Sequence, residues 1–362
     1  MSTLVLPSPR QEAWRYSDLS ALPALTLVRP SGIAPDGDVP WIGCGGPRLL
    51  FVDGVFRPEL SDAGPVMLGA LDVDAGGHPL AGLTGRTGWR LALGRGHAAA
   101  GTIEIVHLAT GGANHLAGEI VLDEDAQASV VETFAGEGWS NRFTAIRLAR
   151  SARLMLSRRV LARDGFTSLT DRAEIGGGAS LVSIALAAGA ADTRLDGQVV
   201  MAGSAGFAEA GGVLLARARQ RHDANYAVRH AEPDGQSRQF WRSVADDRAT
   251  CSAAARVEVA RDAQKTDGEQ SLKGILLART ATINVKPELE IFADDVKCAH
   301  GATVGELDRN ALFYLASRGI PPGEARALVT RAFVADVIER IGEERVREAF
   351  MDDADRWLRG TA

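Results

Sequence analysis

The chain has 362 residues, of which 46% are hydrophobic and 24% are charged, as in a globular protein with a large core. Its formal net charge of −6 disfavours nucleic acid or an anionic membrane surface as a partner. The first ten residues carry no basic stretch followed by an apolar one, which predicts no signal peptide, and no apolar run is long enough to span a bilayer. The three cysteines are odd in number and far apart, which favours a reducing compartment and predicts a cytoplasmic protein.

Residues 1–94 are expected to form an N-terminal region of mixed, partly helical structure. Ser8 followed by Pro9 and Gln11 has the pattern of a helix start, with a cap, a proline in the first turn and a capping-box glutamine. Further on, Asp53-Gly54 separates two apolar runs and predicts a tight β-hairpin. This region therefore supplies both a docking helix and the first strands.

Residues 95–304 lose helical periodicity and show short β-type runs between turn residues. Four of these runs begin with small residues and then alternate; aligned on Ala128, Ala152, Ala179 and Ala205, they recur after 24, 27 and 26 residues. A repeat of this length suits one coil of a parallel β-helix, in which stacked coils share a core. An irregular antiparallel sandwich fits the same short strands, so the spacing alone leaves both folds open.

Residues 305–362 return to helical periodicity. Three short amphipathic segments follow one another: the first ends at Gly319, the second carries Phe333 and Val337 on one apolar stripe, and the third has its own stripe ending near Trp357. These helices are expected either to cap the open end of the β region or to dock another protein.

Several motifs resemble other kinds of functional site, but the residues around them do not fit the structure that such a site needs. The glycines of Gly94-x-Gly96 are followed by a β-type run where a dinucleotide site needs a helix, and no Walker sequence occurs, so we expect no nucleotide to bind this chain. Asp294 and Asp295 would suit a polysaccharide-cleaving β-helix enzyme, but neighbours on a strand point to opposite faces. Four scattered histidines lack zinc-site spacing and are expected to be structural: His107, His115, His222 and His230.

Cys298 and His300 stand apart because they occupy positions i and i+2 where the β pattern ends. On a strand both side chains leave the same face, about 7 Å apart. A thiolate and an imidazole suit zinc, ferrous iron or an iron–sulfur cluster, but two ligands are too few, so another part of the chain or a second protein must contribute. An inert cysteine beside a surface histidine fits the spacing as well.

One stretch adds what spacing cannot. The chain contains the run "KPELEIFADDVKCAHGATVGELDRNALFYLASRGI", and "AQKTDGEQSLKG" lies upstream of it from residue 263. Together these segments closely resemble the SufB/SufD family, the scaffold components of the Suf iron–sulfur cluster assembly system. Supporting matches are "RHAEPDGQS" at residues 229–237 and "EAWRYSDL" at residues 12–19. The short chain, the latter motif and the absence of a cysteine-rich N-terminal segment are most similar to the SufD branch; the SufB branch would require more thiols.

The resemblance implies a mainly β protein: a right-handed parallel β-helix with helical regions at both ends. It implies a non-enzymatic scaffold that pairs with SufB through the end of the β-helix and docks the SufC ATPase through its C-terminal helices. By position, Cys298 and His300 fall where the family faces SufB, so they are the candidate ligands of a transient iron–sulfur cluster shared with SufB. The resemblance leaves open whether a flavin binds and whether the isolated chain forms a homodimer. The alternative from another class is the polysaccharide-acting β-helix enzyme.

Overall fold

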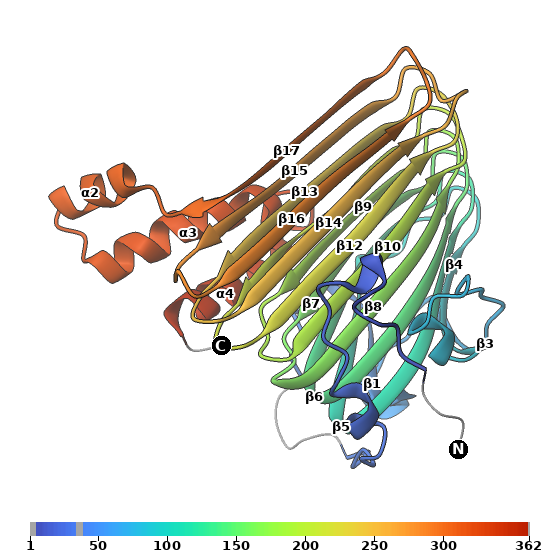
Figure 1. The fold of residues 1–362 in the computed structure, drawn as a ribbon. Coiled ribbons are helices and arrows are strands. Elements are labelled where there is room, and N and C mark those ends of the chain that lie inside the picture. Colours follow the sequence, from blue (N-terminus) through green and yellow to red (C-terminus); the bar gives the residue numbers. More distant parts are fainter. Residues whose placement is uncertain (1–4, 34–38, 361–362) are drawn as a thin grey trace.

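Parallel strands stacked into a solenoid form the body of the protein, and helices flank it (Figure 1). A computed structural model describes residues 5–33 and 39–360. The prediction of no signal peptide rests partly on residues 1–4, which lie outside these ranges. No helix within the described ranges is long and apolar enough to cross a membrane. The fold is therefore the predicted β-solenoid with terminal helical segments.

Two parallel ladders make up the solenoid, and the long strands β5 and β6 belong to both. The first ladder consists of β4 (Thr87–Leu93), β5 (Thr102–Leu122), β6 (Gln127–Leu148), β8 (Asp164–Ile175), β10 (Asp192–Met201), β12 (Arg221–His230), β14 (Thr250–Val259) and β16 (Thr282–Ile291). The second consists of β1 (Gly45–Val52), β5, β6, β7 (Arg153–Val160), β9 (Ser180–Ala187), β11 (Phe207–Ala216), β13 (Gln236–Ala245), β15 (Asp267–Leu276) and β17 (Lys297–Glu306).

The repeat length predicted from the sequence is right, but the alignment of the first and last runs is wrong. In the structure Ala128 pairs with Leu154, and Leu154 with Leu181, so these three residues are equivalent in successive coils. Ala152 and Ala179 instead occupy the buried turn position before each strand, where Ala126 precedes them. Ala128 therefore lies two residues beyond the position of Ala152 and Ala179, whereas Ala205, whose φ of 58° is close to that of Ser151, lies one residue before it. The alignment failed because small residues occur both at the turn and at the strand start.

Each coil turns through a residue with left-handed backbone conformation. Asp125, Ser151, Asp234 and Lys265 have φ between 58° and 63°, an uncommon region for residues other than glycine. Each donates its N–H to a carbonyl of the next coil: Asp125 to Arg150, Ser151 to Gly177, Asp234 to Gln264 and Lys265 to Asp295. The strained conformation is retained because this hydrogen bond, repeated from coil to coil, satisfies a turn amide that would otherwise be unpaired.

Glycines allow β5 and β6 to bend from one ladder to the other. Gly138 has φ 112°, and a β-carbon placed on it would lie 2.5 Å from the carbonyl oxygen of Gly112 in the neighbouring strand. Any side chain at this position would therefore separate the two strands. Glycine is required at this corner because the two backbones approach closely there.

The N-terminal region confirms one prediction and corrects another. Asp53 and Gly54 form the tight turn of a hairpin between β1 and β2 (Val55–Phe56). No α-helix starts at Ser8, where the chain forms a turn and then the short 3₁₀ helix η1 (Glu12–Trp14) and α1 (Leu22–Leu25). Packing decides this outcome, because Trp14 and Leu22 are buried against the first ladder. The remaining elements here are η2 (Pro58–Leu60), β3 (Val66–Ala70) and η3 (Ala81–Leu83).

The C-terminal region forms the three expected helices: α2 (Arg309–Ser317), α3 (Pro322–Ile338) and α4 (Glu344–Arg359). Figure 1 shows α2 projecting away from the solenoid, while α3 and α4 lie beside its strands. The apolar stripe that carries Phe333 and Val337 faces the solenoid: Val337 is fully buried in a core cluster shared with strands of the second ladder, and Phe333 packs against that cluster. These two helices therefore cover the solenoid, and α2 is left exposed.

The two ladders end at unpaired strands. β16 pairs only with β14, and β17 pairs only with β15, so one edge of each is free of other described strands. Nearly all residues of β17 are exposed, and those of β16 are half-buried or exposed. The other strands of the solenoid reach much deeper burial. This end of the solenoid is open and carries two edges that present unsatisfied backbone N–H and C=O groups.

Candidate functional site at the open end

Cys298 and His300 lie on the last strand, β17, on the face that is turned into the solenoid. Cys298 packs against a buried apolar cluster that includes Val257 and Ala263. Because side chains alternate along a strand, His300 leaves the same face two residues later. The structure thus brings the two predicted residues together at the open mouth, with Cys298 half-buried and His300 exposed.

The thiol of Cys298 sits over Gly268 of β15, its register partner. A β-carbon placed on Gly268 would lie 3.4 Å from Sγ of Cys298, an ordinary contact distance, so the sulfur packs directly above this position of β15. Burial raises the pKa of the Cys298 thiol, and the nearby carboxylate of Asp267 raises it further. The thiol is therefore protonated near neutral pH, and a cation must displace that proton before sulfur binds it.

Behind His300 runs a row of buried amide side chains. In register, His300 pairs with Gln270, and Gln270 pairs with Gln239 one coil further in. The amide nitrogen of Gln270 donates to Oε1 of Gln239 at 2.7 Å, and that of Gln239 donates to the backbone oxygen of Tyr226 at 3.3 Å. Both glutamines are almost fully buried. The two amides thus form a row, called the amide row below, that runs from the backbone of Tyr226 to Gln270, the register partner of His300. Both amides donate toward Tyr226.

The described residues contain no group of three or more histidine, cysteine, aspartate or glutamate side chains able to hold a metal ion. The open end therefore offers one imidazole and one thiol, both of which are ligand types for iron. A complete coordination sphere there needs donors from outside these residues. Asp294 and Asp295 lie in the bend between β16 and β17 and belong to neither strand.

Charged residues also line the interior, deeper in the solenoid. His107 is fully buried between the rings of Phe51 and Phe134, at 5.4 and 4.7 Å. Nε2 of His107 lies 3.1 Å from Glu132, and Nδ1 accepts a hydrogen bond from Arg142 at 3.2 Å. Burial, together with the charge of Arg142, lowers the pKa of His107 to about 4, so the ring is neutral and donates to Glu132. The expected structural role of this histidine agrees with its contacts.

From Glu132 the network continues toward the open end. Arg158 donates to Glu132 at 2.8 Å and also pairs with Asp171, and all three side chains are buried. Tyr226 lies beside Asp171: burial raises the pKa of its hydroxyl, and the carboxylate of Asp171 raises it further. Paired charges are tolerated inside because each ion satisfies the other. The same Tyr226 starts the amide row, so polar groups extend from His107 to the rung beside His300.

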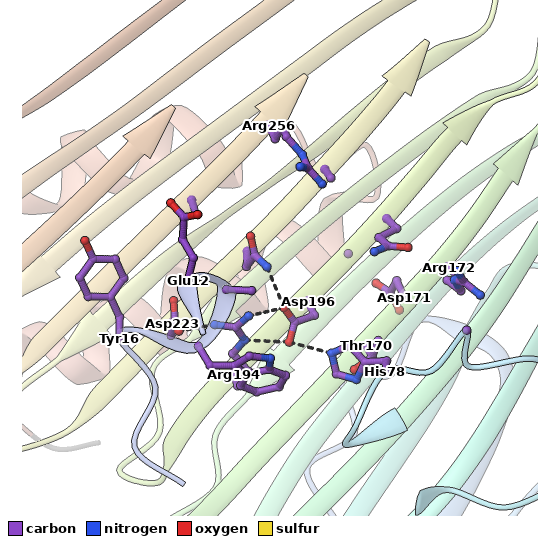
Figure 2. Close-up of a pocket in the computed structure, with 18 of the residues that line it drawn as sticks. Glu12, Tyr16, His78, Thr170, Asp171, Arg172, Arg194, Asp196, Asp223 and Arg256 are labelled. Atoms are coloured by element: carbon purple, nitrogen blue, oxygen red, sulfur yellow. Dashed lines mark hydrogen bonds and ion pairs between the residues drawn. The ribbon is translucent and has the colours of Figure 1, made fainter. Parts of the chain in front are cut away.

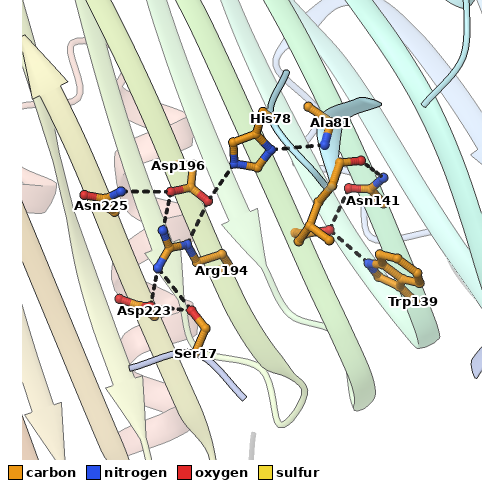
Figure 3. Close-up of polar contacts among 11 residues, drawn as sticks. Ser17, His78, Ala81, Trp139, Asn141, Arg194, Asp196, Asp223 and Asn225 are labelled. Atoms are coloured by element: carbon orange, nitrogen blue, oxygen red, sulfur yellow. Dashed lines mark hydrogen bonds and ion pairs between the residues drawn. The ribbon is translucent and has the colours of Figure 1, made fainter. Parts of the chain in front are cut away.

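The outer face of the first ladder holds a cavity of 420 Å³ under the N-terminal segment (Figure 2). Arg194 lies at its base, 4.6 Å from the ring of Trp14. Arg194 bridges Asp196 and Asp223 (Figure 3). The hydroxyl of Ser17 donates to Asp223 at 2.6 Å. The carboxylates neutralise this arginine. We therefore assign the network to holding the N-terminal segment on the solenoid.

A second hollow, of 500 Å³, lies between α2, α3 and the ends of β15 and β17. Leu276 and Leu277 form its floor on the solenoid side, and Leu312, Phe313 and Pro322 come from the helices. The side chain of Phe313 is 77% exposed and that of the adjacent Tyr314 is 56% exposed. Large apolar side chains so exposed on a projecting helix indicate a surface for another protein.

Sequence reasoning found Cys298 and His300 but missed the residues behind them. Gln239, Gln270 and Tyr226 are ordinary polar residues at inward strand positions, and only the register of the coils shows that they form a row. Glu132, Arg158 and Asp171 were missed for a related reason. Charged residues at inward positions interrupt the alternation of apolar residues along a strand. This interruption is the one local sequence signal that could have indicated them.

The structure so far defines a class: a parallel β-solenoid with an imidazole and a thiol at an open end and flanking helices. Residues 107–333 match the family described as "SUF system FeS cluster assembly, SufBD core domain", and the chain therefore belongs to the SufB/SufD family of iron–sulfur cluster assembly proteins. Within that family it is most like SufD. It is 28% identical, over 99% of its length and 90% of the relative, to the iron-sulfur cluster assembly protein SufD of Escherichia coli (strain K12).

Two further relatives agree with membership of the SufB/SufD family. An iron-sulfur cluster assembly SufBD family protein of Synechocystis sp. is 25% identical over 94% of this chain and 85% of its own length. A SufBD family protein of Mycobacterium tuberculosis (strain ATCC 25618 / H37Rv) is 32% identical over 49% of this chain and 46% of its own. Iron–sulfur cluster assembly is thus the process to which this chain belongs.

Proposed function

We propose that this chain is a non-enzymatic scaffold subunit that pairs with a SufB-type protein and supplies half of a cluster-assembly site. The observation that carries the proposal is the open end of the solenoid, where His300 and Cys298 lie on the inward face of the free edge strand β17. An iron–sulfur cluster would be cargo, bound while it is built. His300 would ligate iron, and Cys298 would ligate iron or relay sulfur.

The mode of pairing follows from the free backbone edges. A second solenoid could add its own edge strands to β16 and β17, because both present unpaired N–H and C=O groups. This arrangement would place donors from the partner opposite His300. The same edges would let the isolated chain pair with a second copy. Pairing at these edges would let the partner supply the remaining ligands, so that two ligands from this chain would be enough for a shared cluster.

The second part of the proposal concerns the ATPase. The exposed apolar surface of α2, centred on Phe313 and Tyr314 beside the hollow over Leu277, supports docking of a SufC-type ATPase there. Docking in this way would supply the nucleotide chemistry for which this sequence has no motif. We place the working complex in the cytoplasm, as the cysteine pattern predicts.

The test is reconstitution on the assembled complex. The chain is co-expressed with SufB- and SufC-type partners, purified and loaded anaerobically with iron and sulfide. His300→Ala should leave complex formation intact and sharply reduce iron, sulfide and visible absorbance, and Cys298→Ser should cause an equal or smaller loss. Thr303→Ala is the matched control, because Thr303 is exposed on the outward face of the same strand. Equal cluster content in the His300→Ala and control complexes would refute the ligand role.

A further inference from the structure

One acceptor at the end of the amide row has no partner. Oε1 of Gln270 is buried and has no hydrogen-bond partner among the described residues, although the side chain is only 1% exposed. Its amide nitrogen is occupied by Oε1 of Gln239 at 2.7 Å and by the backbone oxygen of Glu288 at 3.4 Å. A buried amide oxygen without a donor is costly, so its position calls for an explanation.

The direction of the row shows where a donor can come from. Each amide donates toward the interior: Gln270 to Gln239, and Gln239 to the backbone of Tyr226. Each oxygen therefore accepts from the residue on the side of the open end. For Gln270 the next residue in register on that side is His300, one strand spacing of about 4.8 Å away.

We propose that Gln270 is a positioning residue for His300, and that its Oε1 accepts the proton of one imidazole nitrogen. A neutral imidazole carries its proton on one nitrogen and its lone pair on the other. When the protonated nitrogen points toward Gln270, the lone pair of the other nitrogen points away from the amide row. That lone pair is then free to bind an iron atom. The inference rests on the proposed function, in which His300 binds iron, and names the group that orients this ligand.

The other hydrogen bonds of the amide row hold Gln270 in the orientation that this contact needs. Gln270 cannot rotate its amide freely, because its nitrogen is bonded both to Gln239 and to the backbone of β16. The oxygen is therefore held in place before His300 acquires a partner. A preoriented acceptor of this kind selects one tautomer and one ring orientation of the histidine.

The test reads the tautomer of His300 directly in the full-length isolated chain. The protein is labelled with ¹⁵N-histidine, the His300 signals are identified from their loss in His300→Ala, and nitrogen shifts are recorded where the ring is neutral. In the wild type one tautomer should be favoured about fivefold more than in an unstructured peptide, as expected for one net hydrogen bond. Gln270→Met removes the acceptor at similar volume and should abolish that preference.

Gln239→Met is the matched control, because it removes the same amide from the row one coil further in, away from His300. It should weaken the preference without abolishing it, because the amide nitrogen of Gln270 loses one of its two acceptors and keeps the backbone oxygen of Glu288. A wild-type ratio equal to that of a free peptide, or a ratio unchanged by Gln270→Met, would overturn the proposal. Should Gln270→Met fail to fold, the wild-type ratio alone decides.

A second arm keeps this inference separate from the proposed function. In the complex with a SufB-type partner, Gln270→Met should weaken iron binding at least about tenfold, the usual effect of losing a group that orients a ligand. If the tautomer shifts but His300→Ala keeps full cluster content, Gln270 positions His300 and the ligand role fails. If His300→Ala loses the cluster and Gln270→Met changes neither tautomer nor iron binding, the ligand role stands and the positioning role fails.

Discussion

The carboxylate of Asp353 in α4 accepts two hydrogen bonds from the guanidinium of Arg159 in β7, at 2.6 and 3.2 Å. Both side chains are buried, and Arg356 also contacts this carboxylate. The pair ties the last helix to the second ladder across nearly two hundred residues of sequence. Since α3 buries Val337 and α4 buries Phe350 and Trp357 in one core cluster with strands of the second ladder, these helices are part of the folded body.

Asp353→Asn should destabilise the whole protein. The substitution leaves the buried guanidinium of Arg159 without its counter-charge, which typically costs about 3–5 kcal/mol. We expect the midpoint of urea unfolding to fall, with strands and helices lost in one transition. Asp355→Asn, at a more exposed position on the same helix, is the control. A midpoint within error of the control would show that Arg159 is satisfied by its other contacts.

Docking of the ATPase should depend on α2 without depending on fold stability. Phe313→Ala removes a large exposed side chain and should weaken binding of a SufC-type protein by about 2 kcal/mol, roughly thirtyfold, while the unfolding midpoint stays unchanged. Titration calorimetry against the purified ATPase measures this. Val337→Ala should instead lower the unfolding midpoint, because Val337 lies in the core. Unchanged affinity of Phe313→Ala would move the docking site elsewhere.

The free edge of β17 offers a substitution that blocks pairing alone. In a parallel ladder alternate residues turn their N–H groups to opposite sides, and Lys297 donates to Thr266, so the N–H of Val304 faces away from β15. Val304→Pro should therefore keep the hydrogen bonds with β15 and remove one edge donor. We expect loss of SufB-type partner in co-purification with little change in circular dichroism.

Val304→Thr is the control for that variant, since it keeps the N–H and the branched shape of the side chain. Retention of the partner by both variants would argue that pairing does not use the backbone of β17. Loss by both would indicate that the side chain of Val304, which is 40% exposed, is the contact.

Acid should weaken the fold through buried histidines. Burial lowers the pKa of His107 and of His222 to about 4, against about 6.5 in the unfolded chain. Between these values the unfolded chain binds protons that the folded chain does not, so stability is full above pH 6.5 and falls as the pH drops toward 4. The loss approaches roughly 3 kcal/mol for each residue at the lower limit.

Urea unfolding at several pH values between 7 and 4 measures this slope. His222→Gln keeps a donor for the backbone oxygen of Leu215, which lies 3.0 Å from Nε2, but cannot titrate. Its unfolding free energy should therefore change less steeply across the window than that of the wild type. An identical slope in the variant would mean that His222 binds a proton as readily in the folded chain as in the unfolded chain.

The sequence was informative about period and poor about register. The 24 to 27 residue offsets predicted coils of the right size, since Gln127 pairs with Arg153 and Ser180 pairs with Phe207. Assigning each alanine to the turn or to the strand was beyond the pattern, because both positions select small residues. The helix expected at Ser8 failed because burial of Trp14 against the first ladder outweighed the capping signal.

The candidate site was predictable only where chemistry is concentrated in few residues. A cysteine and a histidine two positions apart stand out in any sequence, and the family resemblance placed them. Gln270, which we propose positions His300, lies thirty residues before it and becomes its neighbour only through the pairing of β15 with β17. Contacts between coils depend on turn lengths, which local patterns define weakly.

The open end has a consequence for how partners are told apart. Backbone N–H and C=O groups on β16 and β17 are the same in any parallel strand, so they would accept a related solenoid and a second copy of this chain alike. Discrimination must then come from the side chains that flank those edges. The charges there, such as the Lys286–Glu288 pair on β16 and Glu306 at the end of β17, are therefore where selectivity between self and non-self would be encoded.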